Sequence, residues 1–315
     1  MASRSERRLR AFGAGGTVAR GCCPFRPFRV FTVLCGDRDA REDCASCWEA
    51  GETVARTIAF ANQKGGVAKT TSTLAIGASL AQMGSRALLV DLGPQGCLTY
   101  SLGLDSDALD MTVHDVLVGR VPAGKTIHQL AEVDLIPANI DLAGAEAYLL
   151  TRTGREYALR TSLEDVQIHY DWILLDCPPS LGVLTINALT AADAVIIPMQ
   201  CEALSHRGVG QLLETMDDVR RLTNRQLEVI GILPTMYDSR TQHAQEILED
   251  VGRRYRLPVL DPPIRKSIRF AEAPRSGRSI MKFAPSHPGA DSYRQIARSL
   301  LDAANAASQQ DAAQH

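Results

Sequence analysis

The apolar positions of the chain fall into short, nearly continuous runs, which is the pattern of strands buried on both faces of a parallel sheet. Each run is followed by a segment with the three-to-four-residue spacing of an amphipathic helix. The strongest runs cover residues 57–61, 86–91, 172–176, 194–198 and 227–234, and shorter ones cover 133–137 and 258–260. This repeated strand-then-helix order predicts an α/β fold with a doubly wound, mostly parallel sheet.

The helical spacing also predicts where the connecting helices lie. Asp141 and either Asp238 or Ser239 are expected to cap two of them, because short polar side chains satisfy free N–H groups at helix starts. The predicted helices are 69–81, 112–118, 125–131, 141–150, 155–167, 185–191, 204–222, 239–255 and 289–306. Residues 263–270 are expected to form a basic loop or a turn of helix.

Three regions are predicted: a disordered Arg- and Cys-rich arm over residues 1–55, one domain over 56–306 and a flexible tail over 307–315. The first thirty residues hold seven arginines and one acidic residue, without a sustained hydrophobic period. A transit peptide, half of a zinc site at Cys44 and Cys47, and translated sequence upstream of the natural start are alternatives for the arm.

Composition argues against several classes of protein. The 34 basic and 36 acidic side chains nearly balance, so any contact with DNA has to come from a local patch. No apolar run approaches the roughly 20 residues of a membrane span. Five of the eight cysteines precede residue 50, and Cys97, Cys177 and Cys201 are isolated. A disulfide framework is therefore not indicated, and a reducing cytoplasm is the expected compartment.

A phosphate-binding loop is predicted where the first strand meets the first helix. The segment reads Asn62-Gln63-Lys64-Gly65-Gly66-Val67-Ala68-Lys69-Thr70-Thr71. In such a strand–loop–helix context, backbone N–H groups and the positive helix N-terminus face a phosphate. Lys69 would reach the β- and γ-phosphates, and the Thr70 hydroxyl would ligate Mg²⁺.

The match to the pattern G-x-x-x-x-G-K-[ST] is imperfect, since Gln63 and Ala68 occupy the two glycine positions. Glycine lets the backbone approach a phosphate closely. Alanine at position 68 adds one methyl group and excludes few conformations if its φ is negative, so nucleotide binding is expected to survive. A glycine-rich turn without a ligand is the alternative.

Two predicted strands end in aspartate. Asp91 closes the strand 86–91, and Asp176 closes the strongly apolar strand 172–176. Ligands of open α/β sheets bind at the carboxyl ends of the strands. A strand that delivers a carboxylate beside the phosphate-binding loop is typical of magnesium sites in nucleotide hydrolases, so Asp176 is the predicted magnesium ligand.

With these residues assembled, the sequence resembles the ParA/Soj family of chromosome- and plasmid-partitioning ATPases. The similarity covers about residues 56–303, and its motifs are residues 62–71, 91–96, 176–181, 198–202, 236–241 and 270–274. The resemblance implies an ATPase of the deviant Walker A type that uses ATP and Mg²⁺. The implied nucleotide-binding residues are Lys64, Gly65, Gly66, Val67, Ala68, Lys69, Thr70 and Thr71; the implied catalytic residues are Lys64, Lys69 and Asp91; the implied metal ligands are Thr70 and Asp176.

The resemblance also implies partners. In the family, the extra lysine, here Lys64, crosses to the phosphates of a second subunit when two ATP-bound subunits form a homodimer. That dimer binds DNA without sequence preference, and a ParB-type centromere-binding protein stimulates hydrolysis. The family's DNA-contacting arginines fall in segments that match Arg240 and Arg269, with Arg265 and Lys266 as neighbours. The implied location is the cytoplasm, on the nucleoid and not on a membrane.

One position departs from the family pattern. The loop after the second strand normally reads Asp-x-Asp-Pro-Gln-Gly, and here Gly93 replaces the second aspartate, which the family uses to position or activate the attacking water. Loss of a general base typically lowers a rate by ~10²–10⁴-fold. We therefore expect ATP binding and dimerisation with slow or absent hydrolysis. Asp91 is a partial substitute, and Cys97 replaces an asparagine common in the family.

Several alternatives stay open beside a hydrolysing partition protein. Gly93 favours a non-hydrolysing, ATP-gated DNA-binding switch or scaffold. A membrane-associated septum-positioning relative is less consistent with the modest apolar face of the last helix. Iron–sulfur and tyrosine-kinase relatives lack the required cysteine pair and terminal tyrosines. Asn187 and Thr235 lie on elements near the nucleotide in the family, and His114, His169 and His206 are assigned structural or surface roles.

Overall fold

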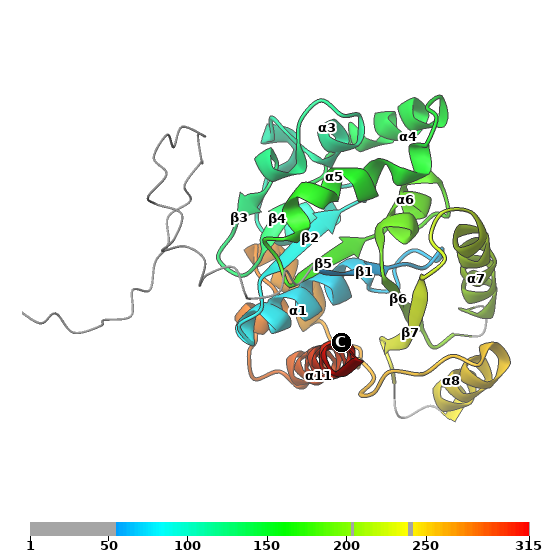
Figure 1. Cartoon of the computed structure of the whole chain (residues 1–315). Coiled ribbons are helices and arrows are strands. Elements are labelled where there is room, and N and C mark those ends of the chain that lie inside the picture. The colour runs from blue at the N-terminus through cyan, green and yellow to red at the C-terminus, as the bar shows by residue number, and fades with distance from the viewer. Residues whose placement is uncertain (1–54, 203–204, 239–241, 315) are drawn as a thin grey trace, which may run out of the picture. The chain divides into compact units, whose positions relative to one another are not determined.

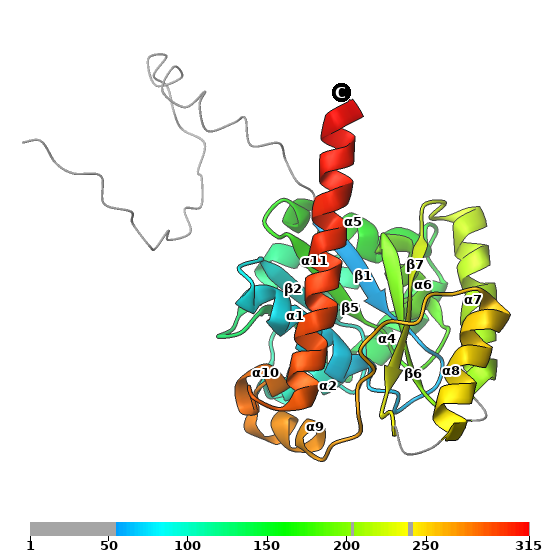
Figure 2. The same ribbon diagram turned by 90° about the horizontal axis from the view of Figure 1, so that it is seen from below.

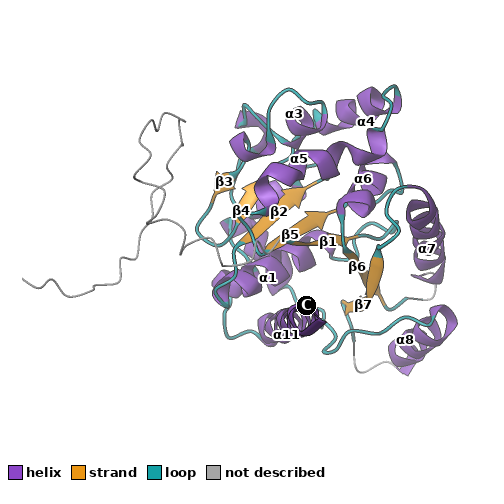
Figure 3. Cartoon of the chain, in the orientation of Figure 1, coloured by secondary structure: helices purple, strands orange, loops and turns teal. Residues whose placement is uncertain are grey.

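The computed structural model describes residues 55–202, 205–238 and 242–314. Within these ranges, seven strands form one sheet in the order β3-β4-β2-β5-β1-β6-β7 (Figures 1 and 3). The strands are β1 Arg56–Phe60, β2 Ala87–Asp91, β3 His128–Gln129, β4 Asp134–Ile136, β5 Trp172–Asp176, β6 Ala194–Gln200 and β7 Glu228–Thr235. The pairs are parallel except β3 with β4, so the predicted doubly wound, mostly parallel sheet is confirmed.

Helices cover both faces of this sheet (Figures 1 and 2). The apolar side chains of α3 to α8 pack on one face, and those of α1, α10 and α11 pack on the other. The helices are α1 Lys69–Gln82, α2 Cys97–Ser101, α3 Val113–Leu117, α4 Leu142–Leu150, α5 Ala158–Gln167, α6 Val183–Ala191, α7 Ser205–Leu222, α8 Gln242–Tyr255, α9 Arg269–Glu272, α10 Ile280–Phe283 and α11 Pro288–Gln314. None of the described helices is long and apolar enough to cross a membrane.

Parallel pairing brings the carboxyl ends of three central strands to one level. Phe60 lies opposite Asp176, and Asp176 lies opposite Asp91. The loops that follow β1, β2 and β5 therefore leave the sheet side by side, at the edge where open α/β sheets bind their ligands.

The structure differs from the sequence prediction in several places, three of which concern the helices. Residues 125–131 are not a helix: a short 3₁₀ turn, Ala123–Lys125, leads into β3, which pairs antiparallel with β4. Asp141 directly precedes α4, but its carboxylate accepts from the Asn139 side-chain amide at 3.2 Å and not from the helix. The last helix continues to Gln314, past the predicted end at residue 306.

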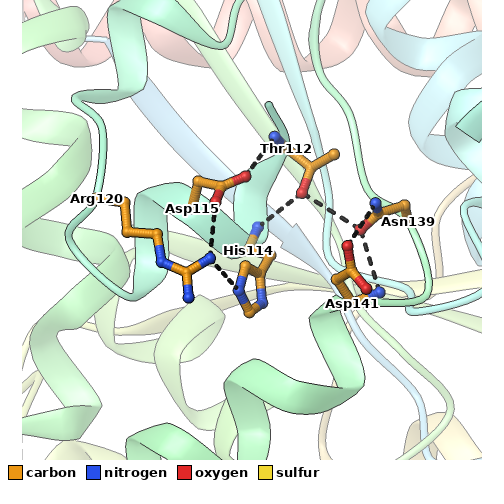
Figure 4. Close-up of polar contacts among 6 residues, drawn as sticks. All are labelled: Thr112, His114, Asp115, Arg120, Asn139 and Asp141. Carbon is orange, nitrogen blue, oxygen red and sulfur yellow. Dashed lines mark hydrogen bonds and ion pairs between the residues drawn. The ribbon is translucent and has the colours of Figure 1, made fainter. Parts of the chain in front are cut away.

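Polar contacts fix α3 against the loop before α4 (Figure 4). The Thr112 side chain and the Asp115 carboxylate form a capping box at the start of α3. Asn139 lies within 3.4 Å of the Thr112 hydroxyl, and Arg120 approaches both Asp115 and the His114 ring at 3.4 Å. These contacts agree with the structural role expected for His114.

Candidate functional site

The loop between β1 and α1 is held by side chains from its own first residue and from strand ends far along the chain. The Asn62 amide donates to the Pro198 carbonyl at 2.8 Å, and its oxygen accepts from the Lys64 N–H at 3.0 Å. The Thr235 hydroxyl, at the end of β7, donates to the Val67 carbonyl at 3.1 Å. Both anchors are buried, so the loop keeps one shape above the sheet.

Lys69 lies inside this loop. Its ammonium donates to the carbonyls of Asn62 at 3.0 Å and Lys64 at 3.1 Å, and the residue is only 7% exposed. Burial lowers the pKa of Lys69, while the nearby Asp176 charge opposes that change. A buried ammonium at the start of an α-helix creates a site for an anion, which is what a phosphate-binding loop needs.

The backbone at Ala68 contradicts the sequence expectation. Its φ is +62° and its ψ is +33°, so the alanine adopts the left-handed conformation and not a negative φ. That conformation costs an L-residue about 1–2 kcal/mol relative to the right-handed region. Gly66 also has a positive φ, +71°, and takes it without this cost. The loop therefore contains local strain at the position where the motif has glycine.

Asp176 has the character of a metal ligand. It is buried, and its Oδ1 has no hydrogen-bond partner among the described residues. Burial and then the neighbouring Asp91 charge raise the pKa of Asp176 to about 8, and hydrogen bonding from the Thr70 side chain opposes the rise. An unpartnered buried carboxylate oxygen beside a hydroxyl suits Mg²⁺, which prefers oxygen ligands and supplies charge neutralisation to phosphate chemistry.

Asp91 lies beside Asp176 in a different environment. One of its oxygens accepts from the Gly93 N–H at 2.9 Å. The other accepts from both the N–H and the hydroxyl of Thr99, at 2.9 and 2.8 Å. Burial raises the pKa of Asp91, and these hydrogen bonds work against that rise. Its oxygens are thus occupied by the loop and by the start of α2.

One cavity of about 660 Å³ joins these elements. Its walls come from the phosphate-binding loop, the loops after β2 and β5, the end of β7 and residues 264–271 of the described chain. A volume of this size suits a nucleotide-sized ligand. The predicted nucleotide-binding, catalytic and metal-binding residues that line it are Gly65, Gly66, Ala68, Lys69, Thr70, Thr71, Asp91 and Asp176. Val67 is buried beneath the loop.

Lys64 is placed differently from Lys69. It does not line the cavity, and its ammonium forms an ion pair with Glu202 at 2.6 Å. The two side chains are 34% and 53% exposed, so the pair lies at the surface. Of the two lysines in the loop, only Lys69 is directed at the ligand space of its own chain.

The described cations among those predicted to contact DNA lie on one short segment but have different surroundings. Arg265 and Lys266 line the nucleotide-sized cavity. Arg269 begins α9 and pairs with Glu272 at 3.0 Å, with more than half of its side chain exposed. Arg240 lies outside the described residues, as do the arm over residues 1–54 and the cap at Ser239.

The sequence places Thr235 near the nucleotide and Asn62 in the loop motif, but it assigns no individual role to these two residues or to Thr99. Asn62 and Thr235 anchor the phosphate-binding loop, and Thr99 holds Asp91. Thr235 ends β7 and Asn62 follows the end of β1 by two residues, and this position at the ligand-binding edge of the sheet could have identified both. Asn187 is not at the site: it donates to Arg155 and accepts from Leu159, so it fastens α5 to α6.

Comparison with known proteins agrees with this geometry. A family model described as an AAA domain matches residues 55–229. The chain is 42% identical to the sporulation initiation inhibitor protein Soj of Bacillus subtilis, a match that covers 78% of this chain and 98% of that protein. It is 40% identical to the chromosome partitioning protein ParA of Myxococcus xanthus, over 79% of this chain and 89% of that protein.

A solved structure is similar as well. It is described as cobyrinic acid a,c-diamide synthase from Mycobacterium smegmatis with bound ATP analog and magnesium. The sequence identity is 53% and the TM-score is 0.70, and the match covers 79% of this chain and 95% of that chain.

Exchanging the left-handed residues of the loop should change stability in opposite directions. Ala68→Gly removes the conformational cost and should raise the free energy of unfolding by about 0.5–1 kcal/mol, after allowing for the more flexible unfolded chain. Gly66→Ala should lower it by about 1 kcal/mol, because a Cβ there meets no atom within 4 Å and only the backbone cost applies. Urea unfolding without nucleotide measures both. A shift of the two variants in the same direction would contradict the strain at Ala68.

Asp176→Asn should change how stability depends on pH. Because folding raises the pKa of Asp176 from about 4 to about 8, the folded protein binds the extra proton between those pH values. The parent should therefore lose stability as pH rises from 6 to 9 in EDTA, while the variant should change less and be more stable at pH 9 by roughly 1 kcal/mol or more. Denaturant unfolding across this pH range is the measurement, and parallel profiles would rule the effect out.

The variant should also lose most of the thermal stabilisation that Mg²⁺-ATP gives the parent.

Proposed function

Because the chain belongs to the ParA/Soj family of chromosome-partitioning P-loop ATPases, we propose that it binds ATP with Mg²⁺ and acts as an ATP-gated partition protein. In this proposal, Lys69 binds the β- and γ-phosphates of the nucleotide in its own chain. Thr70 and Asp176 hold Mg²⁺. The ATP-bound form is a homodimer that binds DNA without sequence preference in the cytoplasm, on the nucleoid, and a ParB-type protein regulates it.

The observation that carries this proposal is that the two lysines of the loop have different positions. Lys69 lies in the cavity, whereas Lys64 lies outside it and pairs with a surface carboxylate. A lysine that is not used by its own nucleotide site is available to a second subunit. A positive charge supplied in trans stabilises the transferring phosphate, as an arginine finger does.

Slow hydrolysis is part of the proposal. Gly93 supplies no side chain to the loop where the family has its second aspartate, and the Asp91 oxygens already accept from Gly93 and Thr99. Asp91 therefore acts as the anchor of this loop and of α2, and not as a substitute base. A non-hydrolysing DNA-binding switch is the second candidate, and Gly93 is the feature that favours it.

The relative described as a diamide synthase raises a third candidate, ATP-dependent amide formation. An enzyme that takes nitrogen from glutamine through a cysteine needs a thiol with a lowered pKa. Among the described cysteines, burial raises the pKa of Cys97 and Cys177, and raises that of Cys201 to about 11. These thiols do not favour amide formation by that route.

Single-turnover hydrolysis distinguishes the first two candidates. In Gly93→Asp, the new Cβ would lie 3.3 Å from Asp91 Oδ1, a contact that a small shift relieves. We expect this variant to hydrolyse ATP on the order of 10²-fold faster than the parent in the presence of DNA and a ParB-type protein. Lys64→Ala should remove the gain, because the partner's lysine would be lost.

Two outcomes would contradict this account. A parent that is fully active and gains nothing from Gly93→Asp would show that the missing aspartate does not limit the rate. A Gly93→Asp variant that keeps its gain after Lys64→Ala would show that no lysine acts in trans. Analytical ultracentrifugation with and without a non-hydrolysable ATP analogue checks the dimer independently.

DNA binding should depend on Arg269. Arg269→Ala should weaken binding similarly for all sequences and reduce the slope of log K against log salt by about 1 for each lost phosphate contact. Arg221→Ala is the matched control, because Arg221 forms a surface i,i+3 ion pair with Asp218 like that of Arg269 with Glu272. Fluorescence anisotropy at several salt concentrations measures both variants. Equal salt slopes in Arg269→Ala and the parent would remove Arg269 from the DNA contact.

A further inference from the structure

We propose that the Gln95 side-chain amide positions the attacking water, in place of the carboxylate that is absent at position 93. The inference rests on the proposed ATPase function and deepens it by naming a residue for the hydrolytic step. It also explains why the hydrolysis proposed above would be slow and not absent.

Hydrogen bonds hold the backbone around Gln95 in a turn. The Gly96 N–H donates to the Gly93 carbonyl at 2.9 Å, which closes a turn with Pro94 and Gln95 at its centre. Asp91 fixes both ends of the loop through the N–H groups of Gly93 and Thr99. The turn therefore fixes the backbone position from which the Gln95 side chain reaches the cavity.

The Thr99 hydroxyl extends this support. It donates to Asp91 at 2.8 Å and accepts from the Ala138 N–H at 2.9 Å, so the loop is tied to the chain that follows β4. All three groups are buried. A water-positioning side chain needs this kind of support, because a misplacement of 1 Å can lower a rate by about 10²-fold.

Elimination within the loop points to Gln95. The loop residues that line the cavity before α2 are Gly93, Pro94 and Gln95, and Cys97 lines it at the start of α2. Glycine and proline have no side-chain polar atom, and burial raises the pKa of the Cys97 thiol. Gln95 is exposed to the cavity and carries both an acceptor and donors.

Three charged side chains that line the cavity, Asp91, Lys69 and Asp176, have partners or another proposed role. The Asp91 oxygens are occupied, the Lys69 ammonium is held by two carbonyls, and Asp176 is the metal ligand. The contact to the Gln95 oxygen is weak by comparison: the Cys97 sulfur lies 3.9 Å away. A water molecule therefore replaces the Cys97–Gln95 contact more easily than it replaces the hydrogen bonds to the Asp91 carboxylate.

An amide orients water without accepting its proton. The Gln95 oxygen would accept one hydrogen of the water and so direct a lone pair of the water oxygen at the γ-phosphorus. The water oxygen forms a bond to phosphorus as the bond to the β–γ bridging oxygen breaks, and ADP leaves with that electron pair. The water proton passes to a phosphate oxygen of the product, since no side chain in the loop takes it.

The test separates the transition state from the ground state. Gln95→Ala should weaken binding of the full-length protein to ADP–aluminium fluoride with Mg²⁺ by about 10-fold or more, while affinity for a non-hydrolysable ATP analogue stays within about 2-fold. Single-turnover hydrolysis should fall by the same factor as the aluminium fluoride affinity. Gln129→Ala, which changes an exposed glutamine on β3 that does not line the cavity, should change neither ligand's affinity.

A double-mutant cycle completes the test. In the Gly93→Asp background the restored carboxylate takes over the water, so Gln95→Ala should cost less than about 3-fold there. An equal loss for both ligands would make Gln95 a nucleotide-binding or loop-shaping residue and overturn the inference. An unchanged affinity for ADP–aluminium fluoride in Gln95→Ala would also overturn the inference. An equal loss from Gln95→Ala in the parent and in the Gly93→Asp background would overturn it as well.

Failure of the underlying function has a different signature. A parent that does not bind the ATP analogue contradicts the proposed function and the inference together. A parent that binds the analogue but neither hydrolyses ATP nor binds ADP–aluminium fluoride contradicts only the inference, and leaves the non-hydrolysing switch.

Discussion

The site depends on two carboxylates that parallel strand pairing buries side by side. Asp91 and Asp176 end adjacent strands at the same register, and both are almost completely removed from solvent. Two buried charges of the same sign repel each other strongly in a low-dielectric interior. The two carboxylates have different surroundings: backbone N–H groups and Thr99 donate to Asp91, whereas Asp176 keeps a buried oxygen without a hydrogen-bond partner among the described residues. The buried side chains of Lys69 and Asp176 thereby line the same cavity, which suits a ligand that combines a metal ion with phosphate groups.

The different surroundings of Asp91 and Asp176 also explain why a glycine at position 93 is expected to affect hydrolysis. In the loop after β2, the carboxylate that is present serves the architecture, and the position expected to serve chemistry has no side chain. In the proposed function, hydrolysis relies on the remaining groups of this loop, while nucleotide binding uses a different set of residues around Lys69. On that proposal, ATP binding and ATP hydrolysis are separable, because they depend on groups from different loops.

The sequence predicted the parts that follow from local pattern. Continuous apolar runs identified the strands, and their shared carboxyl edge brought Asp91 and Asp176 to the phosphate-binding loop, as the register confirms. It failed at residues 125–131, where a polar edge strand has no alternating signature, and at Ala68, whose positive φ depends on the loop's long-range anchors. The contacts of Thr99 and the pairing of Lys64 with Glu202 join segments that no local pattern connects, so only the three-dimensional structure could give them.

The anchors of the phosphate-binding loop have a consequence for how the protein is made. Asn62 is separated by 136 residues from its partner Pro198, and Val67 by 168 residues from Thr235. A ribosome synthesises at about 5–20 residues per second, so the loop leaves the exit tunnel many seconds before the strand ends that hold it. Contacts between residues so distant in sequence also form late in folding. The nascent chain therefore carries the whole ATP-binding motif long before it can hold a nucleotide, and becomes able to respond to ATP only when most of the domain has been made.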